Sequence, residues 1–463
     1  MFLRRKSSVV NVGGLLLGGD NPIRIQSMAN TSTLDTDASV AQAKRIVDAG
    51  GEIVRFTTQG RREALNMANI RDGLRNDGYQ VPLVADVHFN SDVADVAAGI
   101  CEKVRINPGN YVDPGRRFRQ LQYSDEEYAA EIRKIDARLV PFLNICKAHH
   151  TAIRIGVNHG SLSDRIMSRY GDTPEGMVES CMEFLRICVK EQFYDVVISI
   201  KASNTVVMAR TVRLLVRQME KEGMAFPLHL GVTEAGEGED GRIKSAVGIG
   251  ALLCEGIGDT IRVSLSEAPE NEIPVARQLV EMTAECAAIR EEAESGITDD
   301  TVCVEFHETD WQTLQMKAAM ALGALFIDGK AHELVIKNDG FTKQQLSRLS
   351  DDILQAARVK FTKTEYISCP GCGRTLYNLE QTIARVKKAI GEKAAEDERF
   401  NHLKIGIMGC IVNGPGEMAD ADYGYVGAGV GRVSLYKGKQ CVLKNIPESE
   451  AVEKLIDLIN DTL

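Results

Sequence analysis

The chain has 463 residues, which is too long for one ordinary domain, so two or three domains are expected. Its content of 44% hydrophobic and 26% charged residues is that of a globular protein, and its net charge of -10 argues against non-specific binding to nucleic acid or to an anionic membrane. No apolar run reaches the length of a transmembrane helix, and "MFLRRKSSVV" lacks the apolar core of a secretory signal. The 11 cysteines therefore indicate reduced thiols in the cytoplasm and not a disulfide framework.

Short strand-like runs alternate with longer helical patterns through the first part of the chain. The predicted strands are 23–28, 52–57, 82–89, 103–110, 152–158, 195–203, 227–235 and 260–266. Between them, segments such as 39–50 and 205–223 carry apolar residues at intervals of three and four and end in Gly. This alternation predicts an α/β fold with a parallel sheet, and eight units match a closed (β/α)8 TIM barrel. A doubly wound open sheet remains an alternative, because the pattern does not show closure.

Three domains are expected. Residues 1–292 form the barrel, with an enlarged and partly helical loop at 111–151. Residues 293–362 form an insert or linker that contains additional strands and helices. Residues 363–463 form a small α+β domain, which opens with a C-x-x-C motif and closes with the helical pattern "SEAVEKLIDLIND".

Cations interrupt five of the eight apolar strands. They are Arg55, Arg105, Arg154, Lys201 and Arg262. Strands of a parallel barrel are buried on both faces, and an unpaired buried charge costs several kcal/mol or more. One alternative is that Asp86, Asp195 and Glu234 pair with these cations. The other is that the cations converge on an anion at the carboxyl end of the barrel, where five cations favour a diphosphate or a twice-phosphorylated ligand.

Further polar residues lie at the same strand ends. They are Ser27, His88, Asn107, Asn158, Ser203, Glu234 and Ser264. Each one alone is typical of a helix cap, a loop hydrogen bond or, for His88, a packed core histidine. The glycine-rich "GVTEAGEGEDG" after the seventh strand is a weak indication of a phosphate cradle. As a set, these residues indicate a polar binding site.

A candidate metal centre begins at Cys369 and Cys372, which form the only C-x-x-C in the chain. Cys410 ends an apolar strand and precedes the turn "IVNGPGE", so its thiol and the carboxyl of Glu417 are candidates for the remaining ligands. Three thiolates and one oxygen favour an iron–sulfur cluster. A zinc site that includes His402, the only nearby imidazole, is the alternative.

Several motifs together resemble the hydroxymethylbutenyl diphosphate synthase family of the non-mevalonate isoprenoid pathway. They are "VADVHF", "RINPGN", "IRIGVN", "SIKAS", "PLHLGVTEAG", "SEAP", "SCPGCGRT" and "MGCIVNGPGE". The resemblance implies a TIM barrel joined to a domain similar to a sulfite-reductase module. It also implies a [4Fe–4S] cluster with Cys369, Cys372, Cys410 and Glu417 as ligands.

The implied activity is the two-electron conversion of 2-C-methyl-D-erythritol 2,4-cyclodiphosphate to (E)-4-hydroxy-3-methylbut-2-enyl diphosphate. The resemblance implies that the strand cations and their polar neighbours bind this cyclic diphosphate, and that Glu417 acts catalytically by releasing the cluster. It further implies ferredoxin or flavodoxin as the electron donor, and a homodimer in which the cluster domain of one chain closes over its partner's barrel. Residues 293–362 resemble a reduced form of the extra domain of the longer family members.

Glu234, in "VTEAG", is the candidate general acid, because a hydroxyl leaves as water only when it is protonated. The alternative is that Glu234 only pairs with Arg262 or Lys201. A different function is also compatible with the pattern, namely a non-redox phosphosugar lyase or binding barrel with a structural zinc knuckle. A nucleic-acid-binding zinc module is disfavoured by the net charge and by the absence of a second C-x-x-C.

Overall fold

The computed structural model describes residues 2–113, 122–412, 414–418 and 420–462. Its main sheet contains β3 (Arg24–Met28), β4 (Ile53–Thr58), β5 (Leu83–Val87), β6 (Lys103–Ile106), β7 (Ala152–Asn158), β8 (Val196–Lys201), β9 (His229–Leu230) and β10 (Thr260–Ile261). Neighbouring strands follow the order β8-β7-β6-β5-β4-β3-β10-β9 and all pair in parallel. A parallel bridge from Ile198 to Leu228 joins the two ends of this order. The sheet is therefore a closed TIM barrel, as predicted, and the open-sheet alternative is wrong.

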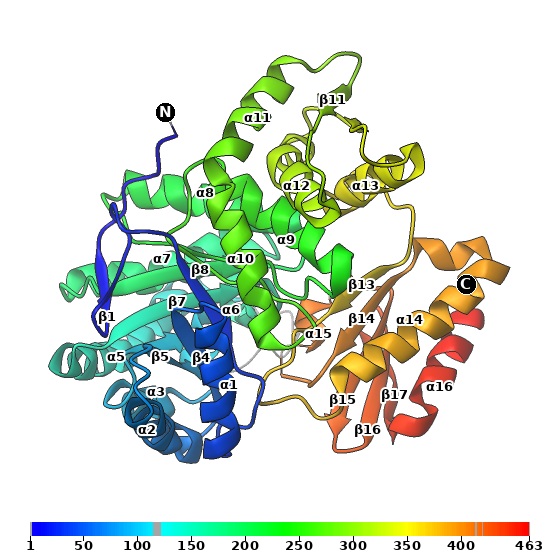
Figure 1. Cartoon of the computed structure of the whole chain (residues 1–463). Helices are drawn as coiled ribbons and strands as arrows, with labels where there is room; N and C mark the ends of the chain where they lie inside the picture. Colours follow the sequence, from blue (N-terminus) through cyan, green and yellow to red (C-terminus); the bar gives the residue numbers. More distant parts are fainter. Residues whose placement is uncertain (1, 114–121, 413, 419, 463) are drawn as a thin grey trace.

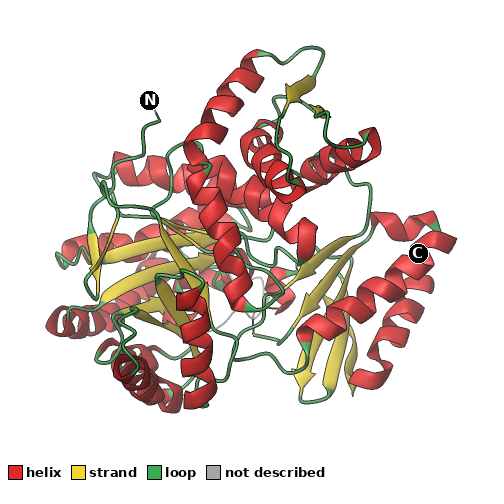
Figure 2. Cartoon of the chain, viewed as in Figure 1, coloured by secondary structure: helices red, strands yellow, loops and turns green. Residues whose placement is uncertain are grey.

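The outer layer consists of α1 (Thr36–Asp48), α2 (Arg61–Asn76), α3 (Ser91–Ala98), α5 (Asp125–His149), α7 (Pro174–Lys190), α8 (Thr205–Lys221), α9 (Gly238–Leu253) and α10 (Glu272–Glu281) (Figures 1 and 2). Side-chain caps begin several of them; Asn204, for example, accepts hydrogen bonds from two amides at the start of α8. Helix α5 begins with a capping box of Ser124 and Glu127 and packs against α3 and α7. Most of the expected loop at 111–151 is therefore the regular outer helix between β6 and β7.

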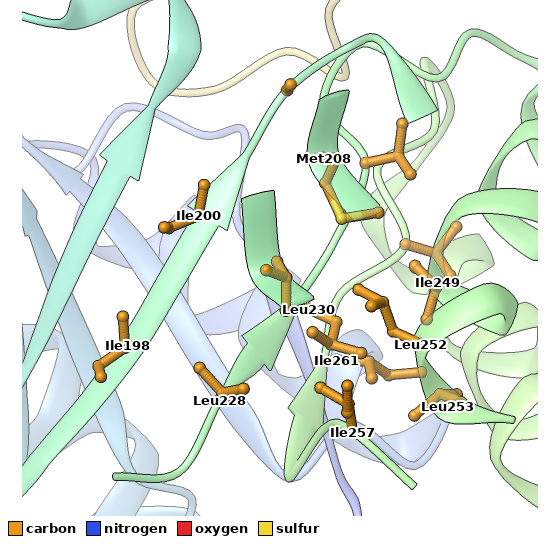
Figure 3. Close-up of a cluster of buried hydrophobic side chains, with 14 of the residues drawn as sticks. Ile198, Ile200, Met208, Leu228, Leu230, Ile249, Leu252, Leu253, Ile257 and Ile261 are labelled. Atoms are coloured by element: carbon orange, nitrogen blue, oxygen red, sulfur yellow. The ribbon is translucent and has the colours of Figure 1, made fainter. Parts of the chain in front are cut away.

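A hairpin closes the amino end of the barrel. Strands β1 (Val10–Val12) and β2 (Leu15–Leu17) pair antiparallel, and they bury an apolar cluster with the first residues of the barrel strands. Next to this end, the barrel wall is apolar as well. Figure 3 shows Leu230 and Ile261 of β9 and β10 beside Leu252 and Leu253 of α9, and Ile198 on β8 farther away. Polar ligands are thus directed to the opposite, carboxyl end of the strands.

The last two barrel strands are shorter than the sequence predicts. Strands β9 and β10 have two paired residues each, whereas the apolar pattern extends through 227–235 and 260–266. The residues that follow them leave the ladder at the carboxyl end of the barrel. Glu234 there adopts a left-handed backbone with φ of 49°, which is unusual for a residue with a side chain and typical of strain at a functional site.

The segment after α10 packs on the outside of the barrel. It contains α11 (Thr283–Ser295), β11 (Thr301–Glu305), α12 (Trp311–Ile327), β12 (Glu333–Lys337) and α13 (Lys343–Ala356), and β11 pairs with β12 in parallel. The side chains of 314–327 are all buried, because α12 lies against α9 on one side and against α11 and α13 on others. The additional strands and helices predicted for 293–362 are present in this layer.

The C-terminal domain is a five-stranded sheet covered by helices. Its strands β13 (Glu365–Ser368), β14 (Lys404–Met408), β15 (Tyr423–Gly429), β16 (Arg432–Lys437) and β17 (Gln440–Pro447) are ordered as they are numbered. The first three pair in parallel and the others antiparallel, and α14 (Leu379–Glu396) and α16 (Glu448–Asn460) bury the apolar face. This is the predicted α+β domain. Its likeness to a sulfite-reductase module stays a prediction.

The C-terminal domain closes over the barrel of its own chain (Figure 1). Ser368 at the end of β13 forms a parallel bridge with Ala235, and the Ser266 hydroxyl group hydrogen-bonds the carbonyl of Cys369 at 2.9 Å. Gly160 and Gly416 meet so closely that a Cβ on Gly416 would lie 1.9 Å from the carbonyl oxygen of Gly160. The resemblance implied closure over a partner's barrel; in this chain the contact is intramolecular. None of the helices in the described part is both long and apolar enough to span a membrane.

Gly323 tests the packing of α12 against α9, and Gly391 of α14 is its control. A Cβ on Gly323 would lie 2.9 Å from the Val247 side chain of α9, whereas a Cβ on Gly391 of α14 would meet nothing within 4 Å. Gly323→Ala should lower the free energy of unfolding by about 1–3 kcal/mol through overpacking. Gly391→Ala should raise it by about 0.5–1 kcal/mol through helix propensity. Urea denaturation measures both changes, and a neutral Gly323→Ala would contradict the close packing of α9 and α12.

Candidate functional site

A cavity lies between the carboxyl end of the barrel and the C-terminal domain. Of the predicted site residues, Arg55, His88, Arg105, Arg154, Asn158, Lys201, Glu234, Arg262 and Ser264 line it from the barrel, and Cys369, Cys372, Cys410 and Glu417 line it from the C-terminal domain. The fold thus brings the cation group and the cysteine group into one space, although about a hundred residues or more separate them in the sequence.

Two of the predicted substrate contacts are placed outside this lining. The Asn107 side chain accepts a hydrogen bond from the amide of Gly109 at 3.1 Å and donates one to the hydroxyl of Ser161 at 2.8 Å, so it caps the short helix Pro108–Tyr111. The hydroxyl of Ser203 donates to the backbone carbonyl of Glu417 at 3.2 Å. Both side chains support residues near the cavity, and their contact with substrate stays a prediction.

Two of the five cations have carboxylate partners at hydrogen-bond distance. Arg262 donates through Nε and Nη2 to the carboxylate of Glu272 on α10, at 3.0 and 2.8 Å. Arg105 donates to Asp86 at 2.9 Å and to the carbonyl of Gly156 at 2.8 Å. Asp195, the third carboxylate proposed as a partner, precedes β8 at the other end of the barrel and has a backbone hydrogen bond near the hairpin, at Asn11. Pairing by Asp86, Asp195 and Glu234 therefore does not account for the cations.

Other donors in the cavity have no oxygen partner. The guanidinium of Arg55 faces the Met28 sulfur with Nε and Nη2 at 3.0 and 2.7 Å, and its nearest carboxylate, Asp86, is at 3.9 Å. Arg154 is 1% exposed, and its Nε and Nη1 have no hydrogen-bond partner among the described residues. Burying such donors is costly unless a ligand satisfies them. The unpaired donors are therefore suited to an anionic ligand.

The pKa shifts express the same excess of positive charge. Burial, together with the neighbouring arginines, lowers the pKa of Arg55 to about 10 and places that of Lys201 well below its usual range. Burial and the charge of Arg105 lower the pKa of His88 to about 3. His88 is consequently a neutral imidazole near pH 7, in contact with Arg105.

The carboxyl groups of Glu234 and Glu417 lie close together where the C-terminal domain contacts the barrel. The Glu417 carboxylate accepts hydrogen bonds from the amide of Asn158 and, at 3.1 Å, from the hydroxyl of Thr233. Burial and the neighbouring Glu234 raise the pKa of Glu417 well above its usual range, because two carboxylates this close do not both ionise readily. Glu234 makes no ion pair in the described part of the chain, and one of its carboxyl oxygens is buried without a partner. Its predicted pairing with Arg262 or Lys201 is not present, since Arg262 is held by Glu272.

Two of the three cysteines lie just after adjacent strands, and Cys372 lies in the loop that follows the first of them. Cys369 follows β13 and Cys410 follows β14, the neighbouring strand, and the Cys369 sulfur accepts a hydrogen bond from the amide of Gly409 at 3.2 Å. Among the described residues, no three His, Cys, Asp or Glu side chains converge into a group that could hold a single metal ion. His402 lines a different pocket with Asp422, so the predicted zinc alternative loses its imidazole.

The residues that were not predicted from the sequence include Glu272 on an outer helix, Thr233 and Ser199 in the cavity lining, and Arg374, which lies two residues after Cys372. An arginine directly after the C-x-x-C was a visible signal for Arg374. For Glu272, in an amphipathic helix with other glutamates, the sequence offers none.

Replacing Arg154 separates folding from anion binding. Arg154→Met removes buried, unpaired donors and keeps the apolar volume, so the ligand-free variant should be at least as stable as the parent. Millimolar pyrophosphate should raise the melting temperature of the parent and not that of the variant. Arg385→Met, at a 49% exposed arginine paired with Glu448, is the control that keeps the pyrophosphate effect. Equal stabilisation of the parent and Arg154→Met would remove Arg154 from the anion site.

Comparison with known proteins identifies the two parts of the chain. The model of the GcpE TIM-barrel domain matches residues 7–277, and that of the GcpE protein C-terminal domain matches residues 365–461. Proteins from Phocaeicola vulgatus and Bacteroides thetaiotaomicron are both 52% identical, and one from Porphyromonas gingivalis is 44% identical, each over 99% of this chain and 98% of the relative. All three are named 4-hydroxy-3-methylbut-2-en-1-yl diphosphate synthase (flavodoxin). The alignment with the Phocaeicola protein spans 611 positions, so that relative contains segments that this chain lacks. The chain belongs to the GcpE family.

Proposed function

We propose that this chain is an iron–sulfur oxidoreductase that converts 2-C-methyl-D-erythritol 2,4-cyclodiphosphate to (E)-4-hydroxy-3-methylbut-2-enyl diphosphate. The observation that carries the proposal is the single cavity in which buried cations without oxygen partners face three cysteines. The names of the relatives support the reaction and favour flavodoxin over ferredoxin as the electron donor. The homodimer, the cytoplasmic location and the domain limits at 292 and 362 stay predictions.

The donor set fits a [4Fe–4S] cluster. Cys369, Cys372, Cys410 and Glu417 face one cavity, and an amide already donates to the Cys369 sulfur, as is usual around cluster ligands. A bound cluster would supply the two electrons singly. Glu417 would be the oxygen ligand, and without a cluster its carboxyl group is held by hydrogen bonds from Asn158 and Thr233.

The barrel residues bind and orient the substrate. The free donors of Arg55 and Arg154 are suited to phosphate oxygens, and both side chains line the cavity between the two domains. Neutral His88 adds a hydrogen-bonding group without adding charge. A diphosphate fits better than one phosphate, since Arg55, Arg154 and Lys201 remain without carboxylate partners at hydrogen-bond distance among the described residues.

Glu234 is the proton donor in this proposal. Reduction breaks the ring carbon–oxygen bond, leaves the diphosphate on one carbon, and expels the neighbouring hydroxyl as water, which takes up a proton. Glu234 lines the cavity beside Glu417 and is not engaged by Arg262. The alternative of a non-redox phosphosugar barrel with a zinc knuckle has no support from the family or from the position of His402.

The reaction itself is the direct test. Chain purified without oxygen should be brown, and with reduced methyl viologen it should convert the cyclodiphosphate to the linear diphosphate, identified by phosphorus NMR and mass spectrometry. A protein that holds a full cluster and binds the substrate, yet forms no linear diphosphate, would refute the proposed reaction.

Cys410→Ser should remove the cluster and leave the barrel folded. Iron analysis and the visible spectrum measure the loss, and circular dichroism checks the fold. Cys441→Ser is a matched control, because Cys441 is a half-buried thiol of the same domain that lies outside the cavity lining. Full iron content in Cys410→Ser would show that Cys410 is not a cluster ligand.

Glu234→Gln keeps the shape of the side chain and removes its titrating proton. The variant should keep its cluster and bind substrate, while turnover with a chemical reductant falls about a hundredfold or more. Glu281→Gln, at an exposed glutamate of α10, should behave like the parent. Near-parental turnover in Glu234→Gln would exclude the acid role, and loss of binding would instead indicate a structural one.

A further inference from the structure

Arg374 brings a positive charge from the C-terminal domain into the mouth of the barrel. It lies in the loop between β13 and α14, and its side chain is only 8% exposed. Its Nη2 is 3.6 Å from the carboxylate of Asp86 on β5. This is an ion pair across the contact between the two domains, and it exists only when they are closed.

The same guanidinium faces the cysteines. The Arg374 side chain hydrogen-bonds Cys372 and lines one cavity with Asp86 and Cys410.

The loop fixes this position. The hydroxyl of Thr375 accepts a hydrogen bond from the amide of Cys372 at 3.0 Å, and the Leu376 amide donates to the carbonyl of Gly409 at 3.1 Å. Gly373 lies directly against the barrel, where a Cβ would be 2.8 Å from the carbonyl oxygen of Thr31. A side chain between these points has little freedom to leave Asp86 while the domains are closed.

Closure therefore changes the charge balance of the anion site. Asp86 already pairs with Arg105 at 2.9 Å and lies 3.9 Å from Arg55. In the closed form a third guanidinium, that of Arg374, therefore lies near Asp86, beside Arg105 and Arg55. An anion consequently binds the closed form better, and by linkage a bound anion favours closure.

We propose that Arg374 is a positioning residue that couples closure of the C-terminal domain to anion binding in the barrel and holds a positive charge beside Cys372 and Cys410. The second part rests on the proposed function, in which these cysteines hold a cluster. A positive charge at that position favours the more negative, reduced form of a cluster. One side chain would then favour closure, substrate binding and reduction together.

Hydrogen exchange on the full-length holoprotein tests the coupling without turnover. In the parent, pyrophosphate should slow exchange in residues 230–236 and 366–377, which meet at the bridge between Ala235 and Ser368. In Arg374→Gln, exchange there should be about tenfold faster or more, and pyrophosphate should slow it less. Arg374→Lys should restore part of the protection, and Arg385→Gln should match the parent.

An EPR-monitored redox titration tests the second part. The midpoint potential of the cluster should be lower in Arg374→Gln than in the parent and unchanged in Arg385→Gln. Unchanged exchange and an unchanged potential in an iron-replete Arg374→Gln would overturn the proposal. If Arg374→Gln does not retain iron, Asp86→Asn removes the same ion pair from the barrel side. Hydrogen exchange in residues 230–236 and 366–377 should then be faster than in the parent. Exchange at the parental rate would contradict a role for the ion pair between Arg374 and Asp86. A parent without any cluster would refute the proposed function, while the exchange experiment would still decide the role in closure.

Discussion

The structure depends on an excess of buried positive charge in the barrel, most of it at the carboxyl end of the strands. Glu272 neutralises Arg262 and Asp86 neutralises Arg105, but Arg154 and Arg55 keep donors with no oxygen partner among the described residues. Such donors destabilise the ligand-free protein and become favourable only when an anion occupies the cavity. The buried unpaired donors thus lower the stability of the ligand-free chain and favour the binding of an anion.

The rest of the chain is arranged around that cavity. The hairpin of β1 and β2 closes the amino end with apolar side chains, so the carboxyl end is the open one. The segment 293–362 packs on the barrel and leads into β13, where Glu365 pairs with Lys244 of the barrel at 3.1 Å and with Arg358 at 2.6 Å. Lys363 pairs with Asp240 at 2.6 Å. These contacts place the cysteines over the cavity within one chain.

Much of the site could be predicted from sequence, because its residues are unusual in their sequence context. Arg154 is a cation within an apolar strand, where a charge is unfavourable unless it has a partner. The C-x-x-C is likewise followed by a distant cysteine on a Gly-Pro turn, a combination that indicates a metal centre. The strand–helix rhythm predicted the barrel in the same way. Glu272 escaped prediction because a glutamate on an amphipathic helix is ordinary, and only the fold shows that it points at Arg262.

The remaining differences arise from tertiary contacts. Sequence periodicity does not show where a ladder ends, so β9 and β10 were expected to include residues that in fact turn into the cavity. It also does not show whether a domain closes over its own chain or over another. Arg374 is important only because closure brings it to Asp86, and that contact joins residues far apart in sequence.

The central claim is that one chain contains a complete site, with anion binding in its barrel and electron transfer in its own C-terminal domain. Mixing two inactive variants tests it most directly. Lys201→Met disables the barrel, and Cys369→Ser disables the cluster domain, while each leaves the other part intact. If the site is built within one chain, turnover of the mixture with a chemical reductant should not exceed the sum of the two variants. Recovery of a substantial part of the parental turnover on mixing would show that the cluster domain serves a partner's barrel, and would contradict the account.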